Sequence, residues 1–314
     1  NLGQINLVIG DNGTGKTTIL KAMYSAMRTV ELDRSSRSQT TTAQTKLLAE
    51  KLSGVFLLLP DDFGHLVSKG AIAPLSCQLH TKAGLMIGYE LDSGAVTSLR
   101  NVQGHFGRPK TQPSTHSTQA PLETDGALET NAAFLSPRDV LSIHSVILRN
   151  RLQEKRFDFD DTDLDLAVAL TANPPRDGNN GIFSVARAGM ERITGGKVQY
   201  DDKEKSWFFE KNGKRYSMGS TAEGYKKIGT LDALLASQYL TPDSTVYIDE
   251  PEASLHPAAI AQFLDIIADL SQSDNDRGIQ FFLASHSYFV IKKLHLIAQK
   301  RQISIPVLQE KDGQ

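Results

Sequence analysis

Short apolar runs alternate with helical stripes along the chain, and this order predicts an α/β protein. The run at 5–9 is followed by a glycine-rich turn and then by a stripe that predicts a helix over about 17–30. Further apolar runs at 55–59, 245–248 and 280–284 predict buried strands. Ser136-Pro137 has the form of an N-cap followed by a proline in the first turn, and the apolar stripe after it predicts another helix. We therefore expect a sheet with helices, organised around the first strand and the turn that follows it.

Two groups of β-like segments predict antiparallel pairing. The first group lies at 75–80, 85–91 and 95–102, and the turns Lys82-Ala83-Gly84 and Asp92-Ser93-Gly94 between them favour hairpins. The second group is a hairpin over 197–200 and 206–210, which contains Trp207. The chain should therefore hold an antiparallel part in addition to its main sheet.

Polar stretches interrupt this pattern. Residues 33–45 predict a mobile surface loop, and residues 105–130, with three prolines and little that is apolar, predict a disordered excursion. A run of arginines and aspartates at 149–165 could suggest a metal site. An EF-hand starting at Asp161 would, however, need glycine in place of Leu166 and glutamate in place of Ala172. We interpret the run as a solvated helix face.

Composition limits the classes of function. With 314 residues, 39 % of them hydrophobic, the chain can bury a substantial core. A net charge of −2 does not indicate nucleic-acid binding, although it leaves room for a local patch. The single cysteine, Cys77, favours a reducing cytoplasm. No apolar run approaches the roughly 20 residues that cross a bilayer, so we expect a cytoplasmic protein that does not enter a membrane.

The turn after the first apolar run carries the clearest chemistry. Gly10, four further residues, and then Gly15, Lys16 and Thr17 form the pattern of a phosphate-binding loop between a strand and a helix. Glycines let successive N–H groups surround a phosphate, Lys16 supplies a point charge, and the Thr17 hydroxyl is placed to bind Mg²⁺. The expected ATP-binding residues are Gly10, Asn12, Gly13, Thr14, Gly15, Lys16, Thr17 and Thr18.

Charged residues follow two later apolar runs. In a phosphoryl-transfer site Asp249 would hold Mg²⁺, and Glu250 would orient and deprotonate the attacking water. His286 should lie at the same edge of the sheet and donate a hydrogen bond to a γ-phosphate oxygen. We assign catalytic roles to Glu250, His286 and Lys16.

A helix start between these motifs has two interpretations. Ser220 and Glu223 have the spacing of a capping box, which is a common way to begin a helix. A serine at a helix N-terminus is also a site for an anion, because the free N–H groups and the helix dipole both favour phosphate. Residues alone leave both interpretations open.

Together the motifs resemble the ABC-type ATPase heads of the AAA15/OLD-like group. The resemblance rests on Gly10–Thr17, Ser220–Gly224, DEPEASLHP at Asp249–Pro257 and ASHS at Ala284–Ser287. This group includes SMC-type heads and the ATPase subunits of bacterial anti-phage systems such as Septu, Gabija, PARIS and certain retrons. The resemblance implies an α/β P-loop NTPase of the ABC-head type, with a mixed central sheet, an antiparallel β subdomain and a helical insertion.

This resemblance also implies a domain plan for the chain. Residues 1–314 would form one ABC-type head. We expect a first lobe over 1–104 with the phosphate-binding loop and the antiparallel β subdomain, the disordered loop at 105–130, a helical insertion over 131–200, and a second lobe over 201–314.

The family further implies that two copies complete each site. Two heads would enclose two ATP molecules, each with Mg²⁺, so that a signature segment of one copy reaches the γ-phosphate held by Lys16 of the other. That segment comprises Ser220, Ala222, Glu223 and Gly224, and the D-loop would contain Ser254 and His256.

Three features depart from the transporter pattern. Ala222 stands where a transporter signature has glycine, and His256 stands where transporters have the D-loop aspartate. The Q-loop residue is not assigned, with Asp61, Asp62 and Gln78 as weak candidates.

Several functions stay open. One is an ATP hydrolase that forms a homodimer or higher homo-oligomer around ATP and regulates an effector, a nuclease or toxin on another chain, in phage defence. The segment after His286 is too short for a nuclease domain, so we expect any cutting group elsewhere. The others are an ATP-gated scaffold that restrains a toxic effector with little turnover, and a DNA-repair-type SMC-like ATPase. A P-loop kinase fits less well, because the gap between Lys16 and Asp249 is long.

Overall fold

The computed structural model describes residues 2–35, 41–59, 62–67, 75–80, 86–91, 99–105, 131–172, 183–272 and 278–309. Its helices are α1 (Lys16–Ser35), α2 (Thr41–Phe56), α3 (Val140–Leu148), α4 (Asp161–Ala172), α5 (Ser184–Thr194), α6 (Glu223–Ala236), α7 (Pro257–Ser271) and α8 (Tyr288–Arg301), with short 3₁₀ or π turns at Phe63–Leu66, Arg149–Gln153 and Met218–Ser220. Its strands are β1 (Ile5–Ile9), β2 (Leu75–His80), β3 (Met86–Leu91), β4 (Leu99–His105), β5 (Ala132–Leu135), β6 (Lys197–Asp201), β7 (Ser206–Lys211), β8 (Lys214–Ser217), β9 (Thr245–Asp249), β10 (Gln280–Ser285) and β11 (Val307–Gln309).

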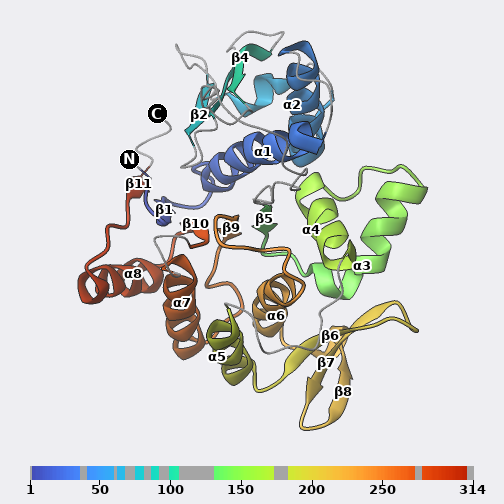
Figure 1. Cartoon of the computed structure of the whole chain (residues 1–314), viewed down its shortest axis with the longest axis vertical. Coiled ribbons are helices and arrows are strands. Elements are labelled where there is room, and N and C mark those ends of the chain that lie inside the picture. The colour runs from blue at the N-terminus through green and yellow to red at the C-terminus, as the bar shows by residue number, and fades with distance from the viewer. Residues whose placement is uncertain are drawn as a thin grey trace, which may run out of the picture.

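A five-stranded sheet in the order β11-β1-β10-β9-β5 forms the centre of the molecule. Its described pairings are all parallel, so β1, β10 and β9 end at the same edge. Figure 1 shows α1 and α2 on one face of this sheet and α5, α6, α7 and α8 on the other. A parallel sheet covered on both faces needs strands that are apolar on both sides, which explains the continuous apolar runs in the sequence.

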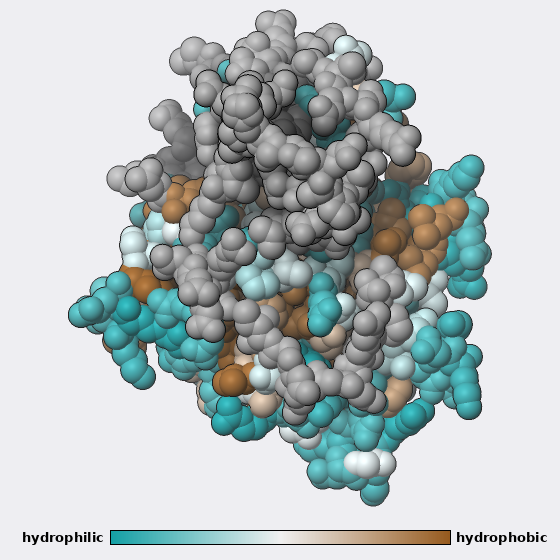
Figure 2. Space-filling model, viewed as in Figure 1, coloured by the Kyte–Doolittle hydropathy of each residue, from teal (hydrophilic) through white to brown (hydrophobic). Residues whose placement is uncertain are grey.

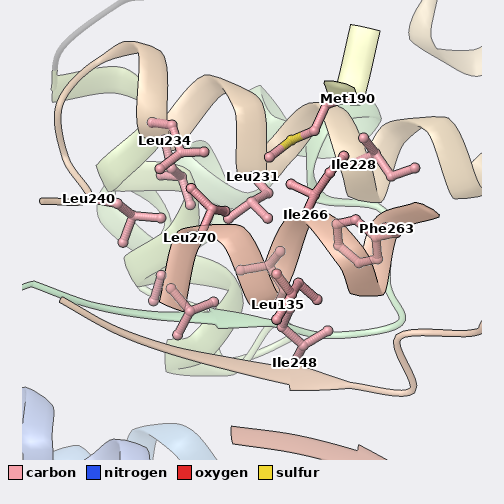
Figure 3. Packing of buried hydrophobic residues seen from close by; sticks show 14 of the residues in the cluster. Leu135, Met190, Ile228, Leu231, Leu234, Leu240, Ile248, Phe263, Ile266 and Leu270 are labelled. Carbon is pink, nitrogen blue, oxygen red and sulfur yellow. The ribbon is translucent and has the colours of Figure 1, made fainter. Parts of the chain in front are cut away.

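Successive residues of each strand enter different cores. Val8, Tyr247 and Phe282 pack with α1 and α2, whereas Leu7, Ile248 and Phe281 pack toward the other helices. On that second side, α6 contributes an i, i+3, i+6 stripe of Ile228, Leu231 and Leu234 that packs with residues of α5, α7, β5 and β9 (Figure 3). This packing fixes α6 against the strand that ends at Asp249.

The antiparallel strands form two separate sheets, β2-β3-β4 and β6-β7-β8. The expected α/β fold and both antiparallel groups are therefore confirmed. The central sheet itself is not mixed, because each of its described strand pairs is parallel. The antiparallel pairs lie in the two smaller sheets. In the space-filling view, hydrophilic residues cover α8 and β6–β8 (Figure 2). No helix among the described residues is both long and apolar enough to span a bilayer.

Two expectations about local structure were wrong. The apolar run at 55–59 does not form a strand, because its first residues end α2. Val55 is fully buried there against the α1 side of the sheet, and a short apolar run does not by itself distinguish a strand from the end of a buried helix. The expected loop at 33–45 is helical at both ends, since α1 runs to Ser35 and α2 begins at Thr41. Residues 106–130 of the expected disordered loop lie outside the described residues.

The charge run at 149–165 is a solvated face only in part. Residues 152–158 are exposed, as expected, but the aspartates at the start of α4 are paired with other helices. Asp160, at the start of α4, accepts a hydrogen bond from Lys21 of α1 at 2.7 Å. Asp161 and Asp165 both lie 2.9 Å from the ammonium group of Lys51 on α2. These partners are more than 100 residues away in the chain, so no local pattern indicates them. Within the described residues, no group of three or more acidic, histidine or cysteine side chains is arranged to hold a metal ion.

The helix after Ser136-Pro137 begins later than expected. The N-cap of α3 is Asp139, whose carboxylate accepts a hydrogen bond from the backbone N–H of Ser142 at 3.1 Å. An aspartate is as good a cap as the serine that the sequence suggested, and the choice between them depends on where the chain leaves β5.

Candidate functional site

The loop between β1 and α1 has the conformation that its glycines predict. Gly13 and Gly15 have φ angles of +84° and +93°, which residues with a Cβ rarely adopt. A Cβ at Gly10 would lie 2.5 Å from Oγ1 of Thr14, so this position also requires glycine. Thr14 in turn donates to the carbonyl of Asp11 at 3.0 Å. The loop is thus a tight turn whose exposed tip, including Asn12 and Gly13, is open to a ligand.

Lys16 begins α1 and lies across this loop. Its ammonium group donates to the carbonyl of Gly10 at 2.9 Å and to the carbonyl of Asp11 at 2.7 Å. The side chain is buried although it carries a charge. A buried ammonium beside a turn of glycine N–H groups is suited to bind phosphate oxygens.

A hydrogen bond of 2.7 Å joins the phosphate-binding loop to the end of β9. Its donor is the Thr17 hydroxyl and its acceptor is Oδ2 of Asp249. Burial raises the pKa of Asp249, and the bond from Thr17 opposes that shift. A hydroxyl and a carboxylate in contact are hard oxygen ligands, and Mg²⁺ is usually bound by one or two carboxylates together with substrate phosphates. The two residues therefore fit a magnesium ion that accompanies a nucleotide.

Glu250 and His286 lie at the same edge of the sheet. The strand register places Ala284 of β10 beside Asp249 of β9, and the Glu250 N–H donates to the Ala284 carbonyl at 2.9 Å. Glu250 has a φ of +49°, a left-handed conformation uncommon for a residue with a side chain. Nδ1 of His286 lies 3.8 Å from Oε1 of Glu250. The predicted residues of this edge are thus brought together by adjacent parallel strands.

Glu252 is a member of this site that the sequence reasoning did not assign. Its Oε1 accepts a hydrogen bond from the Ser285 hydroxyl at 2.7 Å and lies 3.7 Å from Nδ1 of His286. Its Oε2 is buried without a hydrogen-bond partner. The DEPE motif contained this residue, but its contact with Ser285 depends on the pairing of β9 with β10.

Lys227 is a second residue that the sequence reasoning missed. Its ammonium group donates to the Glu250 carbonyl at 2.6 Å. Burial lowers the pKa of Lys227 to about 8, and the carboxylates of Glu252, Glu250 and Asp249 oppose that shift. The signal in the sequence is a pair of lysines within the apolar stripe of α6, where charged residues are rarely buried without a partner.

The segment before α6 does not form a capping box. Ser220 lies in a short 3₁₀ turn, and its hydroxyl donates to the carbonyl of Ser217 at 2.9 Å. The N-cap of α6 is Ala222, which has no side-chain capping bond, and Glu223 pairs instead with Lys226 at 2.7 Å. The spacing was right for a box, but the helix begins too late for Ser220 to cap it. Ser220, Ala222 and Glu223 are all exposed.

Gly224 and the segment after Glu250 are in close contact. A Cβ at Gly224 would lie 2.4 Å from Cδ2 of Leu255 and 2.5 Å from the carbonyl oxygen of Ser254. Ser254 itself has a φ of +61°. His256 caps α7 by accepting a hydrogen bond at Nδ1 from the Ala258 N–H at 3.3 Å.

The candidates for the Q-loop receive no assignment from the structure. Asp62 is exposed and lies 3.3 Å from Nε2 of His65, and Gln78 is exposed on β2. Asp61 lies outside the described residues.

A comparison with known families matches residues 124–292, which is more than half of the chain. The matching family is described as "AAA domain, putative AbiEii toxin, Type IV TA system". The chain belongs to this family. The matched residues, 124–292, include Ser220, Asp249, Glu250 and His286. The glycine-rich loop at 10–17 lies before the matched residues. The membership supports a P-loop ATPase, in agreement with the loop after β1.

Similar solved structures include three heads of SMC proteins. One is an SMC head bound to the C-winged helix domain of ScpA, with 13 % identity, a TM-score of 0.47, and coverage of 93 % of this chain and 85 % of that chain. The SMC head domain from Thermotoga maritima has 12 % identity, a TM-score of 0.41, and coverage of 93 % and 84 %. The SMC head bound to the C-terminal domain of ScpA derived from Pyrococcus furiosus has 13 % identity, a TM-score of 0.39, and coverage of 93 % and 86 %. No curated protein matches the chain.

Proposed function

We propose that this AAA domain is an ATP hydrolase of the ABC-head type that dimerises around ATP and regulates a partner effector in anti-phage defence. The observation that carries the hydrolase is the 2.7 Å bond between Thr17 and Asp249. It joins the phosphate-binding loop directly to the strand end that presents Glu250. A glycine-rich loop without this partner would be only a turn.

The chemistry follows from the placement of the side chains. Lys16 and the loop N–H groups bind the β- and γ-phosphates, and Thr17 and Asp249 are the protein oxygens for Mg²⁺, which neutralises phosphate charge when it is bound. Glu250 is half-exposed at the strand end, where it can take a proton from an attacking water. His286 donates a hydrogen bond to the γ-phosphate.

Assembly into a dimer is supported by the start of α6. Its first N–H groups have no side-chain cap, and the adjoining Gly219, Ser220 and Ala222 are exposed. An uncapped helix N-terminus is a good partner for phosphate. In the proposed dimer this end reaches the nucleotide of the second copy. The family description names a putative toxin of a type IV toxin–antitoxin system, which supports a role in such a system but names no partner effector.

Phosphate release from ATP tests the proposal. We expect the wild type to hydrolyse ATP and the Glu250→Gln variant to lose activity by about 10²-fold or more, because a general base contributes about 10²–10⁴-fold. ATP binding should remain, and the variant should accumulate as an ATP-bound dimer in light scattering. Glu154→Gln, an exposed change in the turn after α3, is the matched control and should behave as wild type.

Two outcomes would contradict parts of this proposal. Equal turnover in wild type and Glu250→Gln would remove the assigned base and with it the hydrolase mechanism. If cells that express Glu250→Gln resist phage infection as well as cells with the wild type, the result would instead favour an ATP-gated scaffold. In such a scaffold, nucleotide binding without turnover restrains the effector.

A further inference from the structure

The five-residue connection from Glu250 to Ser254 is held in an unusual backbone conformation. Glu250 and Ser254 have φ angles of +49° and +61°, although neither is glycine. Left-handed residues with a side chain persist only where surrounding contacts hold them, and such residues gather at functional sites. Glu250 is the residue whose carboxylate must face the attacking water. What holds its backbone therefore decides where that carboxylate points.

The first two turns of α6 supply contacts to both ends of this connection. At one end, the Lys227 ammonium donates to the Glu250 carbonyl at 2.6 Å, and the same carbonyl accepts from the Ala253 N–H at 3.0 Å. At the other end, Gly224 packs so closely on Ser254 and Leu255 that no Cβ fits. Residues 224 and 227 are three apart, so they lie on the same face of the helix.

The bond of Lys227 is specific to this connection. The neighbouring Lys226 forms 2.7 Å ion pairs with Asp139 and Glu223. Lys227 forms its described hydrogen bond with a carbonyl oxygen, not with a carboxylate. A lysine used only to neutralise Glu250 or Glu252 would be expected to bind a carboxylate oxygen directly. Binding the Glu250 carbonyl instead fixes the position of the backbone at Glu250.

We propose that Lys227 is a positioning residue that holds the backbone conformation of Glu250. The direction in which the Glu250 carboxylate points then depends on the position of α6. This inference rests on the proposed hydrolase and deepens it. Because α6 begins at the exposed segment that would contact the second copy's nucleotide, Lys227 links closure of the dimer to alignment of the base. Lys227 itself does not touch the substrate.

Steady-state ATP hydrolysis and ATP affinity of Lys227→Met test this role. The variant keeps an apolar stem that is one atom shorter than lysine and removes the donor. We expect kcat to fall about 10- to 100-fold, since a displacement of about 1 Å can cost about 10² in rate. The Kd for ATP should change less than about threefold, because Lys16 and the loop are intact. Lys227→Arg, which keeps a charged donor, should recover a large part of the rate.

A control variant removes a lysine whose short contact is an ion pair elsewhere in the molecule. Lys293 on α8 lies 2.8 Å from Asp265 on α7, and Lys293→Met should leave kcat and Kd near wild type. If Lys227→Met does not fold, Lys227→Gln takes its place. Its shorter side chain does not reach the Glu250 carbonyl, so the same loss of kcat is expected.

The results separate this inference from the proposed function. An active wild type, an inactive Glu250→Gln and a fully active Lys227→Met would overturn the role of Lys227 alone. So would a variant in which kcat, ATP affinity and thermal stability fall together without recovery in Lys227→Arg, because that pattern describes a merely structural lysine. A wild type without turnover would overturn the hydrolase and this inference with it.

Discussion

Thr17 and Asp249 are in contact although 232 residues separate them in the chain. Lys227 and the Glu250 carbonyl, 23 residues apart, are also in contact, and so are Glu252 and Ser285, 33 residues apart. At the scale of single residues, the site is therefore a set of short bonds between strand ends and helix starts. Each bond depends on one side chain, so single substitutions should give clear effects.

The close approach of Gly224 to the segment after Glu250 gives a test at this scale. We expect Gly224→Ala to lower the free energy of unfolding by about 1–3 kcal/mol, because the added methyl group meets Leu255 and the Ser254 main chain without room to move. Urea denaturation measures the change. Gly219→Ala is the matched control, since nothing lies within 4 Å of a Cβ there. Equal stabilities for the two variants would contradict the contact.

At the scale of elements, partly buried ion pairs bind α4 to α1 and α2. Lys51 of α2 meets two aspartates of α4, and Lys21 of α1 meets Asp160. The helix that begins with Lys16 and Thr17 is thus connected electrostatically to the helical region after β5. A charged side chain in such a place is costly when its partner is removed.

Removing one partner of this network should destabilise the protein strongly. We expect Lys51→Met to lower the free energy of unfolding by about 2 kcal/mol, because Asp161 and Asp165 lose a shared cation in a poorly solvated place and keep, among the described residues, only Arg151 and Arg28 as cationic partners. Lys46→Met is the comparison, because Lys46 lies 3.8 Å from Glu50 in an exposed pair on the same helix. That change should cost less than about 0.5 kcal/mol. A similar small cost for Lys51→Met would show that solvent replaces its partners.

His144 predicts a pH dependence for the packing of α3 on α4. Its Nε2 contacts the Ala167 carbonyl at 3.0 Å and the Thr171 hydroxyl at 2.8 Å, and burial lowers its pKa below the ordinary 6.5. As the pH falls below 6.5, the unfolded chain takes up a proton before the folded protein does, so stability is lost on acidification. A single group contributes at most about 1.4 kcal/mol per pH unit.

Urea denaturation at a series of pH values on both sides of 6.5 checks this prediction. The free energy of unfolding of His144→Gln, which has no titrating ring, should depend less on pH than that of the wild type in the acidic window. If the two free energies of unfolding changed with pH in parallel, the prediction would be wrong, because the pKa of His144 would be the same in the folded and unfolded states.

At the scale of the whole molecule, β1 lies inside the central sheet, between β11 and β10. The loop after β1 and the ends of β9 and β10 therefore occupy one edge of the sheet (Figure 1). The residues just before α6, Gly219, Ser220 and Ala222, are exposed. This arrangement leaves each copy with a nucleotide loop and a separate exposed helix end. Those are the two halves that the proposed dimer would combine.

Mixing two inactive variants tests this division. Lys16→Ala should lack nucleotide binding, and Ser220→Arg should lack the exposed phosphate contact, so each alone should be inactive. An equal mixture should recover about a quarter of the wild-type rate, because half of the dimers contain one intact site of two. Phosphate release on mixing is the measurement. No recovery, in proteins shown to dimerise with ATP, would contradict a site shared between copies.

Much of the fold could be predicted from local patterns. The apolar runs at 5–9, 245–248 and 280–284 are strands because a parallel sheet buried on both faces requires uninterrupted apolar residues. The run at 55–59 is equally apolar, but its first residues form the end of α2, where helix packing buries them. Local composition reports burial and not the backbone conformation that produces it.

The sequence by itself determined the tight turn after β1, since Gly10, Gly13 and Gly15 specify a turn that other residues resist. It also predicted that Asp249, Glu250 and His286 lie at one edge of the sheet, from their positions after apolar strands. Only the tertiary structure decided that Asp249 binds Thr17, that Glu252 binds Ser285, and that Lys227 holds the Glu250 main chain. It also showed that aspartates at the start of α4, which the charge pattern placed on a solvated face, are partly buried partners of α1 and α2. The reason is physical: torsion angles and apolar periodicity act between near neighbours, whereas these bonds form between segments that meet only when the sheet and its helices pack.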